Sequence, residues 1–264
     1  MSPPASPALT TSLAYLASTG DVRIAYARTA GSGPGVVFLG GFMSDMTGTK
    51  ATALEAWARE RNRAFVRFDY RGHGASEGSF EDGTIGTWLG DALAVLDGAT
   101  EGPQVLVGSS MGGWIALLAA RARPARVAGL LGIAAAPDFT RRMWQDEFAE
   151  TEREAIQRDG RVTVPSGYSD EGYVITRDLL EEAEQHMLLD APIPIRCPVR
   201  LLHGMRDEAV PWETSLRIAE QLETDDVEAT LVGSGDHRLS EPDDIDRLLR
   251  TLEDLVLAIP GPRP

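Results

Sequence analysis

Short apolar runs recur along the chain, and stretches with a helical pattern separate them. The apolar runs are continuous rather than alternating, so we interpret them as strands that are buried on both faces. They lie at residues 36–39, 64–68, 105–107, 127–133, 198–202 and 227–232. Helical patterns lie at about residues 47–61, 84–98, 111–122, 213–222 and 242–258. This alternation predicts an α/β fold, with a mostly parallel sheet and helices on both of its faces.

One segment interrupts the alternation of strands and helices. Residues 138–192 have no convincing strand pattern and contain two acidic helical stretches, at about 143–158 and 176–189. So short a segment makes a poor independent core, and we interpret it as a helical lid inserted over one end of the sheet. Residues 1–12 are rich in Ser, Pro, Ala and Thr and are expected to form a loose tail. We therefore expect one domain, 1–264, with a lid insertion.

Charge and composition exclude several classes of protein. Acidic residues number 40 against 25 basic residues, and the resulting net charge of −15 disfavours nucleic acid and anionic lipid surfaces as partners. No apolar stretch approaches the ~20 residues that a membrane-spanning helix needs. A single cysteine, Cys197, fits a reducing compartment, and the first residues lack the charge pattern of a signal or transit peptide. The expected location is cytoplasmic.

A Gly-x-Ser-x-Gly sequence at residues 108–112 follows a buried strand directly and precedes a helical pattern. This context is typical of the nucleophile elbow, a sharp turn that exposes a serine at the end of a sheet. The two glycines leave room for the strained backbone of the central residue. We therefore predict that Ser110 is a nucleophile.

A serine nucleophile needs a base, and in such a fold the residues follow in the order serine, acid, histidine. Among the four histidines, only His237 follows the best acid candidate, in a polar loop between the last strand and the last helix. His237 is therefore the predicted base. His203 is expected to pack beneath the acid loop, His73 belongs to the glycine-rich turn described below, and His186 is expected to be solvated or to cap a helix.

The acid candidate is Asp207, which lies in the loop after the strand at residues 198–202. A carboxylate there would project at the carboxyl end of the sheet, where the base needs an orienting partner. Asp138 follows the strand at residues 127–133 and is the alternative acid.

Acyl transfer also requires hydrogen-bond donors for the developing oxyanion. The backbone N–H of Met111, directly after Ser110, is one candidate. The other is the N–H of Phe42, because Gly40 and Gly41 permit a bend after the first buried strand that exposes this amide. Phe42 and Met111 are thus the predicted oxyanion-hole residues.

A glycine-rich turn at residues 69–76 is interpreted as scaffold, with Asp69 and Arg71 expected to pair and hold it. No strand is followed by a dinucleotide-binding glycine pattern, and no Cys/His cluster has the spacing of a metal site. No cofactor and no metal are expected.

Three stretches together resemble the serine α/β-hydrolase fold. They are the elbow at 108–112, the turn Phe68–Ser76 and the sequence His203-Gly204-x-x-Asp207-x-x-Val210-Pro211. More narrowly, the chain resembles the mitochondrial palmitoyl-protein thioesterase and acyl-glucuronide esterase subgroup, with its bacterial relatives. The residues that carry this resemblance are Gly41–Ser44, Gly48–Ala51, Val107–Trp114, Pro192–Pro194 and Leu201–Met205. The chain departs from the subgroup at Gly40, where the subgroup has proline. The resemblance implies the same three catalytic residues and the same two oxyanion amides.

These residues predict an enzyme that hydrolyses a carboxylic ester or thioester through an acyl-enzyme on Ser110. The expected partner is a small acyl ester or thioester, or an acylated protein. The lid is expected to supply the acyl pocket from Phe139, Met143, Trp144, Phe148, Tyr168, Tyr173, Met187 and Leu188. Acyl transfer to another acceptor, or perhydrolysis, would use the same residues and is an alternative. A protein of this fold that only binds a small ligand is a second alternative.

Overall fold

The computed structural model describes residues 12–165 and 172–259, so the tail expected at 1–12 lies outside it except for Ser12. Within these residues, eight strands form one sheet in the order β1-β2-β4-β3-β5-β6-β9-β10. The strands are β1 (Leu13–Ala17), β2 (Arg23–Thr29), β3 (Ser32–Leu39), β4 (Arg63–Phe68), β5 (Gln104–Ser109), β6 (Val127–Ile133), β9 (Val199–Gly204) and β10 (Val227–Val232). Every neighbouring pair from β4 to β10 is parallel, whereas β2 runs antiparallel to both β1 and β4.

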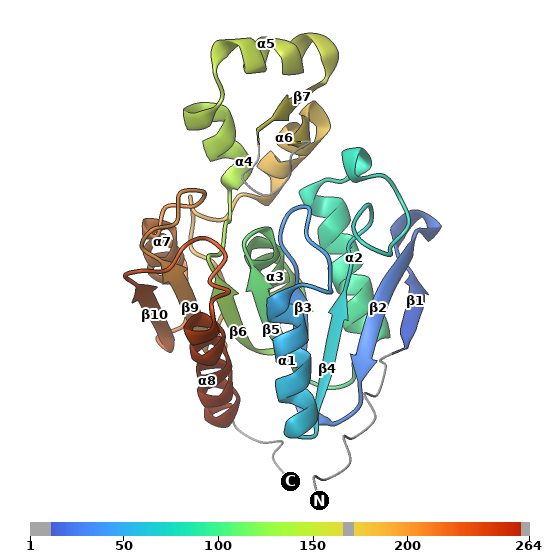
Figure 1. The fold of residues 1–264 in the computed structure, drawn as a ribbon, viewed down its shortest axis with the longest axis vertical. Helices are drawn as coiled ribbons and strands as arrows, with labels where there is room; N and C mark the ends of the chain where they lie inside the picture. The colour runs from blue at the N-terminus through green and yellow to red at the C-terminus, as the bar shows by residue number, and fades with distance from the viewer. Residues whose placement is uncertain (1–11, 166–171, 260–264) are drawn as a thin grey trace, which may run out of the picture.

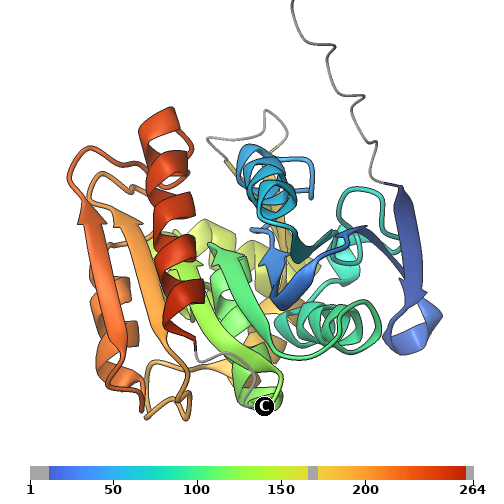
Figure 2. The same ribbon diagram turned by 90° about the horizontal axis from the view of Figure 1, so that it is seen from below.

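Helices cover both faces of this sheet, as Figures 1 and 2 show. One face carries α1 (Thr49–Glu60) and α8 (Pro242–Ala258), and the other carries α2 (Ile85–Gly98), α3 (Met111–Ala122) and α7 (Glu213–Gln221). A hydrophobic core lies on each face of the sheet, and successive residues of β3 contribute to one and then the other. Val36 packs on the side of α1, and Val37 packs on the side of α2. The predicted α/β-hydrolase architecture is confirmed. The strand predicted at residues 227–232 is β10, but it lies at an edge of the sheet and three of its six residues are exposed, so the prediction that it is buried on both faces is wrong.

The first two strands, β1 and β2, are absent from the sequence prediction. The side chains of β1 alternate between exposed and half-buried positions, and β2 carries Arg23, Arg28 and Thr29 among its apolar residues. Neither strand has the continuous apolar run that marks the buried strands. β1 forms one edge of the sheet and β2 lies next to it, and both keep some side chains exposed to solvent.

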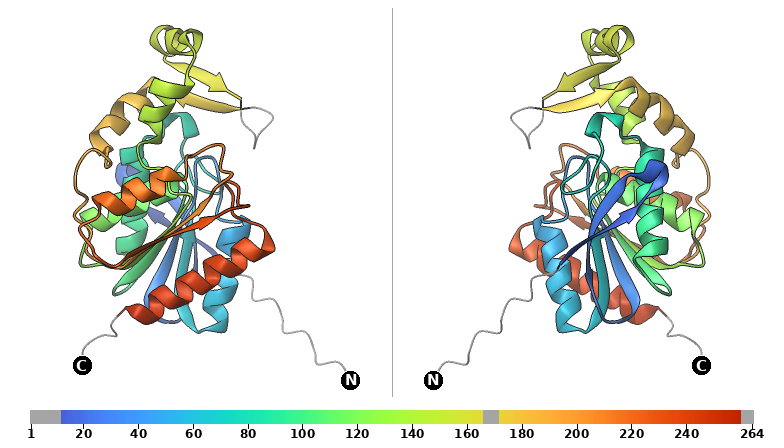
Figure 3. Two further views of the ribbon diagram at one scale, coloured as in Figure 1. Left: turned by 90° about the vertical axis from the view of Figure 1, so that its left-hand side faces the viewer. Right: turned by 90° about the vertical axis from the view of Figure 1, so that its right-hand side faces the viewer.

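The lid lies over one end of the sheet, at the top of the molecule in Figures 1 and 3. Its elements are α4 (Phe139–Arg142), the π-helical turn η3 (Met143–Glu147), α5 (Glu150–Asp159), β7 (Arg161–Val164), β8 (Tyr173–Thr176), α6 (Arg177–Ala183) and the 3₁₀ turn η4 (Glu184–His186). The antiparallel pair β7–β8 corrects the expectation of a lid without strands. Each strand has only four residues, too few to stand out from the helical pattern on either side.

Hydrogen bonds attach the returning part of the lid to the helices below it. The carboxylate of Glu182, in α6, accepts the N–H of Gly86 in the first turn of α2 at 3.1 Å. The indole N–H of Trp114, in α3, donates to the carbonyl oxygen of His186 at 3.1 Å. These contacts place the lid above the segment that follows β5.

Candidate active site

Ser110 stands between β5 and α3 with φ 54° and ψ −120°, a strained conformation for a residue other than glycine. The backbone is packed tightly around it. A Cβ on Gly108 would lie 2.3 Å from the carbonyl oxygen of Gly112, and a Cβ on Gly112 would lie 2.1 Å from that of Leu39. Only glycine fits at these two positions, which explains the spacing of the Gly-x-Ser-x-Gly sequence.

The structure brings Ser110, His237 and Asp207 together in a line of hydrogen bonds. Nε2 of His237 lies 3.1 Å from Oγ of Ser110, and Nδ1 of the same ring lies 2.7 Å from Oδ2 of Asp207. The three side chains come from the segments that follow β5, β9 and β10, and these parallel strands all end at the same edge of the sheet. This arrangement suits a serine hydroxyl that donates to Nε2 while the Nδ1–H donates to the carboxylate.

Asp207 is fully buried and both of its oxygens are engaged. Oδ1 accepts the backbone N–H groups of Ala209 and Val210 at 2.9 and 2.8 Å, and Oδ2 also lies 3.1 Å from Nε2 of His203. Burial by itself would raise the pKa of this carboxyl, but the hydrogen bonds from the two histidines and from Val210 outweigh it and hold the pKa well below its usual range. Asp207 therefore stays ionised and able to orient a histidine.

His203 has a closer role than the packing that the sequence predicts. Its side chain is fully buried. The hydroxyl of Ser215, in α7, lies 2.7 Å from Nδ1 of the ring, which leaves Nε2–H to face Oδ2 of Asp207. In the sequence, the short spacing His203-Gly204-x-x-Asp207 is the feature that could have indicated this contact. His203 and His237 thus share Oδ2 of Asp207.

Asp138, the alternative acid, does not approach His237. Its two oxygens accept the backbone N–H groups of Leu188 and Leu189, each at 2.9 Å, so it joins the two ends of the lid. Burial raises the pKa of this carboxyl, against the effect of these two hydrogen bonds. The structure therefore gives Asp138 a place in the neck of the lid.

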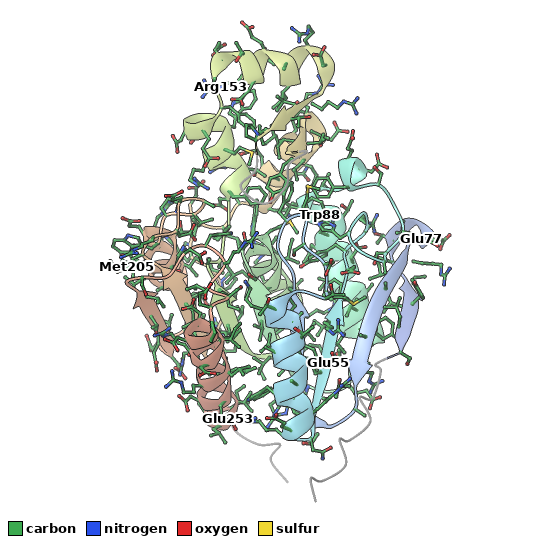
Figure 4. All side chains as sticks on the ribbon, viewed as in Figure 1. Glu55, Glu77, Trp88, Arg153, Met205 and Glu253 are labelled. Carbon is green, nitrogen blue, oxygen red and sulfur yellow. The ribbon has the colours of Figure 1, made fainter. Side chains whose placement is uncertain are left out.

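The loop after β3 lies against Ser110. A Cβ on Gly41 would lie 3.5 Å from Cβ of Ser110, and Phe42 follows directly. The ring of Phe42 makes edge-to-face contacts with Phe80, Trp88, Phe139 and Tyr173. Figure 4 labels Trp88, which lies just below the lid. Met111 is the first residue of α3, where backbone N–H groups have no acceptor within the helix. The two residues predicted for the oxyanion hole thus flank Ser110.

The glycine-rich turn at residues 69–76 is held differently from the prediction. Arg71 pairs with the buried carboxylate of Asp91, in α2, at 2.7 Å. Asp69 instead accepts the backbone N–H groups of Met46 and Ala75 at 2.6 and 2.8 Å. The expected pair between Asp69 and Arg71 is therefore wrong, because each side chain finds a partner in a segment that only the fold brings near.

A cavity of about 950 Å³ opens above Ser110 and His237. The lid adds apolar side chains to its lining, Phe139, Met143, Phe148, Val164 and Tyr173, and also the charged residues Arg142, Glu147 and Glu152. Polar residues come from the loop after β3, from the start of α1 and from the loop after β10: Ser44, Asp45, Thr49, Lys50, Arg238 and Ser240. Of the other residues predicted for the pocket, Trp144, Met187 and Leu188 pack elsewhere, and Tyr168 lies outside the described residues.

Lys50, the only lysine of the chain, is half-buried and lines this cavity. Burial lowers the pKa of its amine from 10.5 to about 8, although Asp236 and Asp244 oppose the shift. The amine is therefore neutral in a larger fraction of molecules at mildly alkaline pH than an exposed lysine is.

This pKa predicts the reactivity of Lys50 toward an amine-acylating reagent. Because only the neutral amine is nucleophilic, we expect the rate of labelling at Lys50 to reach half its maximum at about pH 8. Competitive labelling across a pH series, with the modified peptide identified by mass spectrometry, measures this midpoint. A midpoint near 10.5, the ordinary value, would contradict the burial of the amine.

A family model described as "Alpha/beta hydrolase family" matches residues 36–261. The chain belongs to the α/β hydrolase family. The resemblance drawn from the sequence is thereby confirmed, and the match includes every segment that contributes to the site described above.

Individual members of the α/β hydrolase family are similar over nearly the whole chain. The mouse protein named "Palmitoyl-protein thioesterase ABHD10, mitochondrial" is 46% identical over 93% of this chain and 82% of its own length. The human protein of the same name is 42% identical, over 93% and 80%. The solved structure of the mouse protein superposes with a TM-score of 0.88 at 44% identity, over 94% of this chain and 100% of that one. A putative hydrolase from Agrobacterium vitis superposes with a TM-score of 0.90 at 40% identity, over 93% and 99%.

The names of these relatives correct the expected location. Five relatives at 42–46% identity are named as mitochondrial proteins, so the cytoplasmic prediction is wrong. An unpaired cysteine indicates a reducing environment without saying which compartment provides it. Over the described ranges 12–165 and 172–259, no helix is long and apolar enough to cross a membrane, and no three His, Cys, Asp or Glu residues are grouped to hold a metal.

Proposed function

We propose that this chain is a serine hydrolase that cleaves a carboxylic ester or thioester through an acyl-enzyme on Ser110. The observation that carries the proposal is the line of hydrogen bonds from Ser110 Oγ to His237 Nε2 and from His237 Nδ1 to Asp207, at 3.1 and 2.7 Å. Membership of the α/β hydrolase family supports it. In this proposal Ser110 is the nucleophile, His237 the base and Asp207 the acid.

The proposed reaction proceeds in two halves. Oγ of Ser110 attacks the acyl carbonyl carbon while His237 takes its proton, and the buried Asp207 carboxylate stabilises the imidazolium. The backbone N–H groups of Phe42 and Met111 hold the oxyanion of the tetrahedral intermediate. The intermediate then expels the thiol or alcohol, which receives the proton from His237, and leaves the acyl group on Ser110. Water attacks the acyl-enzyme in the same way, releasing the carboxylic acid and restoring the serine.

For the substrate we propose an acyl thioester with a long alkyl chain, carried by a small molecule or by a protein. The names of the curated relatives support a palmitoyl thioester as a member of this class. The apolar side chains that the lid contributes to the cavity suit an alkyl chain, and the polar residues from the loops after β3 and β10 suit the leaving group. The acyl chain is therefore proposed to bind beneath the lid.

A fluorophosphonate probe, which modifies activated serines, tests the proposal directly. We expect the probe to label Ser110 and to block turnover, because it mimics an acyl group under attack. Folded protein that remains unlabelled, and that turns over no acyl substrate, would favour the alternative of a binding protein. Product analysis with and without an added alcohol or peroxide separates hydrolysis from acyl transfer or perhydrolysis, which use the same groups.

Ester and thioester preference requires a substrate panel. Values of kcat/KM for p-nitrophenyl esters of increasing chain length, for matched acyl thioesters and for an acyl glucuronide rank the classes. The proposal expects long-chain thioesters to rank above short-chain esters. The opposite order would contradict the proposed long-chain thioester and would indicate a serine esterase with a different natural substrate.

Phe148 provides a specific test of the acyl side of the cavity. It is buried in the lid and lines the cavity, so Phe148→Ala lengthens the apolar space. We expect the ratio of kcat/KM for long over short acyl chains to change by roughly tenfold, since one or a few methylenes in a pocket are worth this much. Measuring kcat/KM over a series of p-nitrophenyl esters gives this ratio.

Trp144→Ala is the matched control for Phe148→Ala. Trp144 packs edge-to-face on Phe148, with ring centroids 6.3 Å apart, but lies outside the cavity lining. We expect it to leave the chain-length preference nearly unchanged. If both variants lost activity equally on all substrates, the lid would be structural support rather than a pocket.

A further inference from the structure

Lys50 connects the start of α1 to the loop that carries His237. Its amine donates to the carbonyl oxygen of Arg238 and, at 3.3 Å, to the hydroxyl of Ser240. The two segments are separated by 188 residues in sequence, and Arg238 directly follows His237. The position of the amine is therefore coupled to the position of the histidine ring through one residue of backbone.

The peptide that joins Arg238 to Leu239 is held at both of its polar atoms. Lys50 and, at 3.0 Å, the hydroxyl of Ser240 donate to the carbonyl oxygen, and Oδ1 of Asp236 accepts the N–H of Leu239 at 3.0 Å. Leu239 has φ 44°, in the left-handed region, and its side chain is buried. A residue with a Cβ adopts this conformation only when its surroundings impose it. These side-chain contacts supply that constraint, and Lys50 is the one that comes from a distant segment.

We propose that Lys50 is a positioning residue for His237: its amine fixes the Arg238 carbonyl and so keeps the imidazole within reach of the Ser110 hydroxyl. This inference rests on the proposed function, in which His237 is the base. The bond that depends on the arrangement is the 3.1 Å contact between His237 and Ser110. Misplacement of a catalytic group by about 1 Å can cost on the order of a hundredfold in rate.

The charge on Lys50 contributes to this role, because a charged donor holds a carbonyl more strongly than a neutral one. Asp236 and Arg238 face the amine from the His237 loop, and Asp244 faces it from α8. Burial lowers the pKa of the amine to about 8, so the ammonium loses its proton as the pH rises through this value. We expect kcat to fall above about pH 8, where the amine is neutral.

Two substitutions test the proposal in the full-length chain. Lys50→Met removes the donor and keeps an unbranched side chain of similar length. We expect kcat to fall roughly tenfold to a hundredfold, with little change in KM, because a base has moved rather than a binding group. Labelling of Ser110 by the fluorophosphonate should slow in parallel. Lys50→Arg keeps a donor and a permanent charge, so it should restore most of kcat and abolish its fall above pH 8.

Arg61→Met is the matched control. Arg61 lies at the other end of α1 and pairs with Glu253, so it also joins α1 to the C-terminal part of the chain. Figure 4 shows Glu253 at the end of α8 that lies away from the lid. Removal of this pair should leave kcat and its pH profile as in the wild type.

Wild-type kcat in Lys50→Met would overturn the proposal, and so would an increase in KM alone, which would mark Lys50 as a substrate-binding group. If Lys50→Met does not fold, acetylation of the folded wild-type protein replaces it, because Lys50 is the only lysine. Activity should then fall in proportion to acetylation at Lys50, and full activity in the acetylated protein would overturn the inference. Failure of the proposed function appears separately, as turnover in Ser110→Ala.

Discussion

Ser110→Ala is expected to lower kcat by about 10⁴–10⁶-fold, since the hydroxyl oxygen is the atom that bonds to the acyl group. The fold should remain intact. The backbone of Ser110 makes the structural contacts: its N–H donates to Ile133, and its carbonyl accepts the N–H of Ala136. Alanine keeps the Cβ, so the strained turn is unchanged. Turnover of a p-nitrophenyl ester and thermal unfolding followed by circular dichroism measure the two effects.

Ser109→Ala is the matched control for this variant. Ser109 is the neighbouring serine of the same sequence, and it ends β5 with its side chain buried. We expect this variant to keep most of the wild-type kcat. If Ser110→Ala retained near-normal activity, or if Ser109→Ala proved equally inactive with an intact fold, the assignment of the nucleophile would fail.

Asp207→Asn is expected to lower kcat by roughly 10⁴-fold, because an amide at this position favours the wrong histidine tautomer. The carboxylate accepts Nδ1–H of His237 at 2.7 Å, and an amide N–H₂ placed there would instead require Nδ1 to accept. Nε2 would then carry the proton and could not receive one from Ser110. Steady-state kinetics on the same ester measures the loss.

Asp138→Asn serves as the comparison for Asp207→Asn. Asp138 bonds only to the backbone of the lid neck among the contacts described, so its substitution should reduce stability and lid attachment more than kcat on a small ester. A greater loss of kcat in Asp138→Asn than in Asp207→Asn, with both variants folded, would move the acid to the segment after β6.

The pH dependence of stability gives a second readout for Asp207. Its pKa in the folded protein is held below the usual range, so the folded state binds fewer protons here than the unfolded state does in acid. The carboxylate therefore contributes stability above the pKa of an unfolded aspartate, and this contribution disappears as the pH falls through the lowered folded pKa. The stability deficit of Asp207→Asn, measured by urea unfolding, should be full at neutral pH and shrink in acid.

Much of the framework could be predicted from local pattern. The buried strands and their covering helices are each marked by a continuous run or a helical period, and both signals are properties of neighbouring residues. The nucleophile elbow can also be predicted from local pattern, because contacts within a few residues of Ser110 and with the adjacent strand require glycine at 108 and 112. These features can therefore be predicted without knowing which distant segments contact one another.

Interactions between distant segments were predicted less well. Arg71 was expected to pair with its neighbour Asp69, but it pairs with Asp91 on a different helix. The strands β7 and β8 gave too short a signal by themselves, and their pairing exists only because the lid folds back on itself. The edge strand β1 and its neighbour β2 lack a continuous apolar run because their position in the sheet leaves them partly exposed.

The sequence by itself determined the fold class, the family and the serine and histidine proposed for catalysis, because their types, their order and the residues around them can be read locally. Only the tertiary structure decided which carboxylate meets His237, since Asp138 and Asp207 both follow buried strands and differ only in where those strands lie in the sheet. It also decided that Lys50 reaches the loop of His237, a contact across 188 residues that no periodicity marks. Hydrogen bonds act over about 3 Å, so which distant residues form them is set by the packing of whole elements.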